Sequence, residues 1–122
     1  MRMLPSLSAV LTSSLSFATF AGQAGDPQAA TRGMEHYRIF CANCHGAEAD
    51  GNGPTAKLLK IAPTNLTLLA RMNDGKFDPE KVFKAMDGRH LVGGDQKMPV
   101  FSESLAIKTV LDMVEFLRTI QR

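Results

Sequence analysis

The residues best suited to chemistry in this chain lie together at positions 41 to 45, where the sequence reads CANCH. Both cysteines of the 122-residue chain and one of its three histidines fall within these five positions. Two thiols at this spacing can form a disulfide, exchange electrons as a dithiol, or bind a metal together with the histidine. The sequence around the motif separates these chemistries.

Three of the possible chemistries fit the sequence poorly. A disulfide between Cys41 and Cys44 would close a very small loop and would therefore stabilise the fold only weakly. Thiol–disulfide exchange usually comes with a βαβ pattern, whereas this sequence reads as helix after helix without a convincing alternating strand. A zinc site would need a second pair of ligands downstream, and none follows the motif.

The pattern C-x-x-C-H is instead the attachment signature of c-type haem. On a helical turn, Cys41 and Cys44 stand at i and i+3, so both sulfurs face the same way and can form thioethers to the two vinyl groups of one porphyrin edge. His45 then places its imidazole under the iron as the proximal ligand. One covalently bound haem c with its iron thus uses all three side chains, and we favour this interpretation.

The second axial position of the iron requires a separate assignment. The candidates are a methionine, His36, His90 or no protein side chain at all. His36 lies too close in sequence to the motif to reach the far face of the porphyrin. Met86 falls on the apolar stripe of a predicted helix and is expected in the core. Met98 lies in a glycine-rich loop, where the following Pro99 favours an extended backbone, so we expect Met98 to be the distal ligand.

Three predicted helices position the motif and the loop. The first begins at Asp26 and runs into the motif, the second spans 79–87 between a capping Asp78 and Gly88, and the third opens near Ser102. Their apolar faces comprise Gly33, Tyr37, Phe40 and Cys41 in the first, Val82, Phe83 and Met86 in the second, and Ile107, Val110, Leu111, Val114 and Leu117 in the third.

The N-terminal segment has the organisation of an export signal. Arg2 is followed by an acid-free, moderately apolar run to Phe20, and small residues end at Ala24. Serines and threonines interrupt the run, which does not fit a membrane span of about 20 apolar residues. We therefore expect residues 1–24 to be a cleaved signal peptide and residues 25–122 to form one periplasmic domain without a transmembrane segment.

The charge of the mature domain is nearly balanced. Removal of Arg2 with the signal leaves 13 basic residues against 12 acidic residues, a net charge of +1. Nucleic-acid binding would require a basic patch or stripe, so we expect no nucleic-acid partner.

Four stretches of the sequence together carry a family resemblance. They are CANCH at 41–45, DGNGPTAKLL with APTNLT between 50 and 67, KMPVF at 97–101, and the terminal VLDMVEFLRTIQ. With these the chain resembles the small class I c-type cytochromes, which are monohaem proteins with His/Met ligation. The resemblance implies an all-α cytochrome c fold, with three to five helices wrapped around the haem. It also implies that the N- and C-terminal helices cross, with Gly33 and Tyr37 meeting Phe116 and Leu117.

The resemblance also implies roles for residues outside the motif. The carbonyl of Pro63 is expected to accept the free N–H of His45 and so fix the orientation of the imidazole. Arg71 and Arg89 are candidate partners of the haem propionates. Redox partners are expected to dock on a mainly apolar surface around the exposed haem edge with Lys97 at its rim, so that ionic strength affects electron transfer only modestly.

These expectations indicate an electron carrier rather than an enzyme. Iron with both axial positions filled by His45 and Met98 offers no site for substrate or oxygen, so gain or loss of one electron is the chemistry that remains. We expect an exported monohaem cytochrome that exchanges electrons with donor and acceptor proteins, either as a monomer or as a subunit of a complex. The alternatives are a haem subunit of a periplasmic dehydrogenase or oxidoreductase complex, and a haem sensor or peroxidase-like protein with an open distal site.

Overall fold

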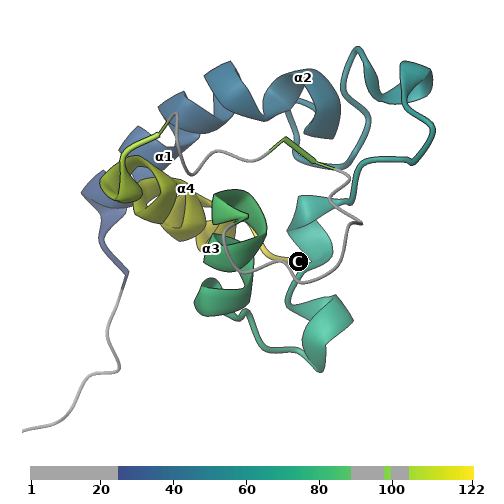
Figure 1. Cartoon of the computed structure of the whole chain (residues 1–122). Coiled ribbons are helices and arrows are strands. Elements are labelled where there is room, and N and C mark those ends of the chain that lie inside the picture. The colour runs from purple at the N-terminus through teal and green to yellow at the C-terminus, as the bar shows by residue number, and fades with distance from the viewer. Residues whose placement is uncertain (1–24, 89–97, 100–104) are drawn as a thin grey trace, which may run out of the picture.

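Helices form all the regular structure in the part of the chain that can be described. A computed structural model describes residues 25–88, 98–99 and 105–122, in which no strand occurs. The elements in these residues are α1 (Pro27–Phe40), α2 (Ala42–His45), η1 (Ala56–Leu58), η2 (Leu66–Leu68), η3 (Arg71–Asn73), α3 (Pro79–Asp87) and α4 (Ile107–Thr119), where η marks a 3-10 helix (Figure 1). The predicted all-α fold is confirmed, whereas the predicted signal peptide at 1–24 lies outside the described residues.

None of the helices in the described part of the chain is long and apolar enough to cross a membrane.

Local capping chemistry fixes the ends of α1 and α3. The Asp26 carboxylate accepts a hydrogen bond from the Gln28 N–H at 2.9 Å, and proline follows as the first helical residue. Asp78 caps α3 in the same way, and Gly88 ends that helix with a φ of 70°. An aspartate before a proline therefore starts both helices, as the sequence predicts.

The first and last long helices cross at Gly33. A Cβ atom at this position would overlap the backbone carbonyl of Asp112 and would lie 2.9 Å from the Cβ of Phe116. The Tyr37 ring packs against Phe116 with centroids 5.3 Å apart, and Tyr37 shares a buried cluster with Leu117. The predicted crossing of α1 and α4 is confirmed (Figure 1).

The buried face of α4 differs from the predicted one. The helix begins at Ile107, after Ala106 in an extended conformation, and the predicted start near Ser102 lies outside the described residues. Ile107 and Leu111 are 56% and 52% exposed. The buried apolar residues of α4 are Val110, Met113, Val114 and Leu117. This stripe also fits the helical period, and packing against both α1 and α3 selects it over the neighbouring one.

Met86 links α3 to α4. It is 6% exposed and forms an apolar cluster with Val110, Met113 and Val114. We call these four residues the Met86 cluster. The partly buried side chains packed against it are Cys41, Phe77, Val82, Phe83, Met98 and Leu105. Met86 is thus a core residue, as predicted.

A buried carboxylate joins α1 to α4 at their crossing. Asp112 is 5% exposed and accepts two hydrogen bonds from the Arg32 guanidinium, at 2.8 Å and 3.0 Å. The Lys108 ammonium donates to the same carboxylate at 3.1 Å. The hydrogen bonds from Arg32, with a smaller contribution from Lys108, lower the pKa of Asp112 below its ordinary value.

Asp112→Asn should therefore destabilise the protein at neutral pH. We expect a loss of ~1–2 kcal/mol in the free energy of unfolding, because the partners are partly exposed and the amide keeps only part of the bonding. Because the pKa of Asp112 is lower in the folded state, its contribution to the free energy of unfolding is complete above the unfolded-state pKa of about 3.9. This contribution is lost as pH falls through the folded-state pKa. Urea unfolding at pH 7 and pH 3 measures both effects.

The matched control is Asp74→Asn, because Asp74 lies exposed in a turn between η3 and α3. This change should leave the urea midpoint nearly unchanged. A gap between wild type and Asp112→Asn that is as large at pH 3 as at pH 7 would contradict the assignment.

Candidate haem site

The C-x-x-C-H motif forms a tight helical turn at the junction of α1 and α2. The N–H groups of Cys44 and His45 donate to the carbonyl of Cys41 at 3.2 Å and 2.9 Å. Both cysteines are free thiols and are partly buried. The predicted turn is therefore present, and its spacing places the two sulfurs on one side of it.

The loop after the motif folds back onto α2 through Thr55. The Thr55 hydroxyl donates to the Asn43 carbonyl at 2.9 Å and lies 3.3 Å from the Sγ of Cys44. The hydroxyl proton is directed at the Asn43 carbonyl, so the hydroxyl oxygen faces Sγ. Thr55 was not singled out from the sequence, since no local pattern marks a contact across eleven positions.

The environment of Cys41 does not activate its thiol. Burial, followed by the nearby Cys44, raises the pKa of Cys41 to about 11. A thiol with this pKa is protonated at neutral pH and is a poor nucleophile. Burial of the Cys41 side chain therefore does not favour dithiol exchange.

His45 is buried, with one ring nitrogen engaged. It is 9% exposed, and its Nδ1 lies 2.9 Å from the carbonyl oxygen of Thr64. A carbonyl can only accept, so Nδ1 must carry the proton in this contact. The lone pair of the neutral imidazole is then on Nε2, the form in which histidine binds a metal.

The acceptor of the His45 N–H differs from the predicted one by a single residue. Pro63 was expected to supply the carbonyl, but its oxygen faces Gly51, where a Cβ atom would lie only 2.5 Å away. Gly51 adopts a φ of 90°, which favours glycine at this close approach. With the Pro63 carbonyl directed at Gly51, it is the Thr64 carbonyl that reaches His45.

Tyr37 and Leu66 both form hydrogen bonds to the loop that follows His45. The hydroxyl of Tyr37 donates to the carbonyl of Gly46 at 2.6 Å in a buried contact. The N–H of Leu66 donates to the carbonyl of Ala49 at 2.8 Å. The Tyr37 bond was missed from the sequence, where a tyrosine instead of a phenylalanine on a buried helix face was the available signal.

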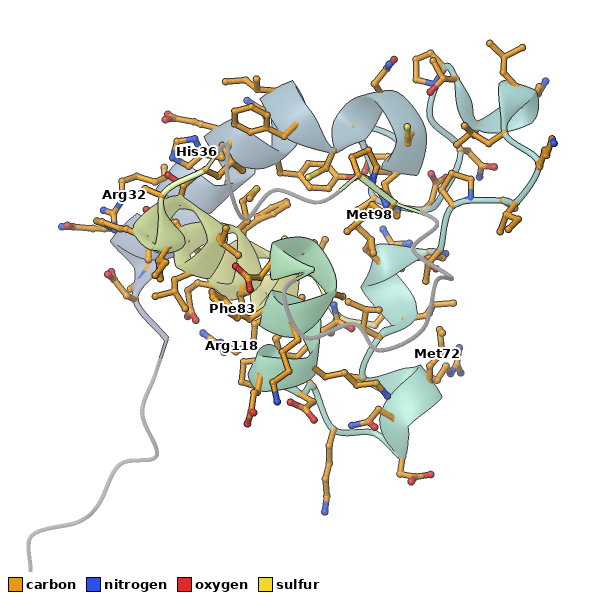
Figure 2. The ribbon with its side chains drawn as sticks, viewed as in Figure 1. Arg32, His36, Met72, Phe83, Met98 and Arg118 are labelled. Carbon is orange, nitrogen blue, oxygen red and sulfur yellow. The ribbon has the colours of Figure 1, made fainter. Side chains whose placement is uncertain are left out.

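The distal candidates are separated by their positions. Met98 is partly buried and packs against the Met86 cluster, as does Cys41. Figure 2 shows Met98 below the α2 turn. His36 is partly exposed on α1, and His90 lies outside the described residues. The fold thus brings Met98 and Cys41 to the same apolar cluster.

The remaining predicted site residues are two arginines and one lysine. Arg71 is exposed on η3, and Arg89 and Lys97 lie outside the described residues. Within the described ranges, no group of three or more His, Cys, Asp or Glu side chains could hold a metal ion directly. The donor set consists of two thiols on one turn and an imidazole that is hydrogen-bonded through Nδ1. This set fits a covalently attached haem.

Comparison with known proteins agrees with this donor set. A family model described as cytochrome C oxidase, cbb3-type, subunit III matches residues 28–117, which include the motif and Met98. No curated protein matches the chain significantly. A chain of the Kuenenia stuttgartiensis reducing HAO-like protein complex is similar in structure, with a TM-score of 0.63 and 20% identity over 88% of this chain.

The two matches differ in how much of the sequence they cover and in what they show. Our chain covers 50% of the Kuenenia chain, and the likeness at 20% identity concerns the fold alone. The family model, in contrast, spans most of the sequence, from α1 to near the end of α4. The chain therefore belongs to the cytochrome c oxidase, cbb3-type, subunit III family of c-type cytochrome domains.

Proposed function

We propose that this electron carrier is an exported, class I monohaem cytochrome. One haem c would be attached through Cys41 and Cys44, with His45 and Met98 as the axial ligands of its iron. The observation that carries the proposal is the bond between His45 Nδ1 and Thr64, because it leaves Nε2 for the iron on the turn that presents both thiols. Family membership supports the same assignment.

The residues of the chain tune and protect the redox centre. The haem iron supplies a one-electron couple between its ferric and ferrous forms. The Thr64 carbonyl fixes the tautomer of His45 and raises the basicity of the imidazole, which favours the ferric form. A thioether from Met98 raises the reduction potential relative to a second imidazole. The Met86 cluster provides an apolar surrounding on the side from which Met98 approaches.

The proposal also covers the N-terminal segment and the partners of the haem propionates. Residues 1–24 serve as the signal that exports the chain to the periplasm. Arg71, which is exposed on η3, and Arg89 are the candidate partners of the propionates. An exposed guanidinium can reach a propionate without leaving a charge unpaired in the core.

Exposed apolar side chains next to the motif supply a docking surface for redox partners. We call Leu58, Leu59 and Ile61 the η1 surface; they are 82%, 45% and 50% exposed. Lys57 and Lys60 are exposed beside them. Thr55, which directly precedes η1, contacts the Sγ of Cys44, so the porphyrin edge attached to Cys44 would lie close to this surface.

Leu58→Ser should slow electron self-exchange between reduced and oxidised copies of the protein. We expect about a fivefold decrease, because ~1 kcal/mol of apolar contact at the centre of the encounter would be lost. NMR line broadening in mixtures of the two oxidation states measures the rate. The matched control Lys57→Gln, at the neighbouring position, should change the rate only slightly.

Ionic strength provides the second arm of this test. With a mature net charge of only +1, added salt should change the wild-type rate modestly. A steep salt dependence, with Lys57→Gln more harmful than Leu58→Ser, would show that lysines govern docking.

A second candidate function is a haem subunit bound permanently to a larger oxidoreductase. It is favoured by the family description, which names an oxidase subunit, and by the similar Kuenenia chain, whose title describes a protein complex. Purification from the native host distinguishes the two functions. Elution at the size of the free domain supports the carrier, and co-purification with a catalytic subunit supports the alternative.

A further inference from the structure

The side chain of Gln121, just beyond the end of α4, holds the segment that contains Thr64. The carbonyl of Thr64 accepts the hydrogen bond from His45. The Nε2 of Gln121 donates to the carbonyls of Leu66 at 2.8 Å and Leu117 at 2.7 Å. Its Oε1 accepts from the N–H of Ala70 at 2.8 Å. Gln121 therefore joins α4 to both ends of the η2 region, more than fifty positions earlier in the sequence.

The orientation of this amide is fixed by its partners. Two carbonyl oxygens face Nε2 and one backbone N–H faces Oε1, so the flipped amide would set oxygen against oxygen. Both amide protons are used. The backbone N–H of Arg122 adds a parallel bond to the Thr67 carbonyl at 2.9 Å, and Figure 1 shows the C-terminus beside η2.

Only one residue, Asn65, separates this attachment from the histidine's acceptor. Gln121 holds Leu66, and the Thr64 carbonyl accepts from His45. Between them, the Asn65 side chain accepts from the N–H of Thr67 at 3.0 Å and from its hydroxyl at 2.6 Å, which stiffens the link. Gln121 therefore ties the residue two positions after Thr64 to Leu117 of α4.

We propose that Gln121 is a positioning residue for the proximal histidine. Gln121 sets the geometry of the His45–Thr64 hydrogen bond and, through this bond, the reduction potential. The inference rests on the proposed function, because it takes His45 as the axial ligand. If η2 is released from α4, the bond loosens and the imidazole becomes less basic. A less basic ligand stabilises ferric iron less, so the potential should become more positive.

The test uses Gln121→Met and Gln121→Glu in the haem-loaded full chain. Methionine keeps the length and most of the volume of the side chain, whereas glutamate keeps the acceptor for Ala70 but loses the donors to Leu66 and Leu117. Spectroelectrochemical titration should show a more positive potential for both variants. In the reduced protein, NMR should show exchange of the His45 Nδ1 proton with solvent accelerated roughly tenfold, the equivalent of ~1.4 kcal/mol.

Two controls separate positioning from stability. Gln28→Met replaces an exposed glutamine on α1 and should change neither measurement. Asp78→Ala removes the N-cap of α3, so it should lower the thermal midpoint while leaving the potential and the Nδ1 proton unaffected.

Failure of this inference and failure of the proposed function would give different results. Gln121 variants that lower the thermal midpoint as Asp78→Ala does, with wild-type potential and proton exchange, would overturn the inference and leave the proposed function intact. A wild-type protein whose haem lacks histidine ligation would overturn both.

Discussion

Replacing both Cys41 and Cys44 by alanine should give a protein with no covalently attached haem and little folded chain. The buried hydrophobic set of the described residues is small: Ala29, Tyr37, Ala49, Met86, Val110, Met113, Val114 and Leu117. A domain of this size has a modest core, and a large apolar cofactor that binds only the folded state adds much of its stability. Acid-acetone extraction measures attachment, and urea unfolding followed by circular dichroism measures folding.

Single substitution at Cys44 is the control for this double variant. Cys44→Ala keeps one thioether at Cys41 and should retain haem through a single bond, which the pyridine haemochrome spectrum detects as an altered band. A double variant that unfolds cooperatively, with native-like secondary structure and no haem, would show that the polypeptide does not depend on the cofactor for folding.

Met98→Ala should open the distal side of the iron. We expect loss of the sulfur-to-iron charge-transfer band and binding of added ligands such as imidazole. The reduction potential should fall by on the order of 100 mV, within the roughly 0.8 V range that axial ligands cover. Optical titration with imidazole and spectroelectrochemistry measure these changes.

Met86→Leu is the matched control, because Met86 belongs to the apolar cluster against which Met98 packs. A leucine of similar volume should leave the spectrum nearly unchanged. The reverse pattern, with the charge-transfer band lost in Met86→Leu and retained in Met98→Ala, would contradict the assignment. Carbon monoxide binding by the reduced wild type at neutral pH would favour a sensor or peroxidase-like protein.

Local chemistry explains which parts of the fold could be predicted from the sequence. The starts of α1 and α3 follow from Asp26 and Asp78, each placed before a proline, and these caps act within one helical turn. The helical turn of the motif likewise depends on neighbouring residues. The crossing at Gly33 is a long-range feature, and it was predictable only through the family resemblance.

The corrections concern features that tertiary contacts decide. The buried stripe of α4 includes Met113 in place of Leu111, because α4 packs between α1 and α3 and two stripes fit its period equally well. The His45 acceptor is Thr64 instead of Pro63, because the Pro63 carbonyl is directed at Gly51. The contacts of Gln121 join residues more than fifty positions apart and leave no local pattern in the sequence.

Absorption spectra of the purified protein, oxidised and reduced, test the central claim most directly. The account predicts a haem that stays with the polypeptide in acid acetone, is low-spin in both oxidation states, and shows a sulfur-to-iron charge-transfer band when oxidised. These features together report attachment at Cys41 and Cys44 and ligation by His45 and Met98. A protein that carries no haem, releases it into acid acetone, or holds it in a high-spin state would contradict the account.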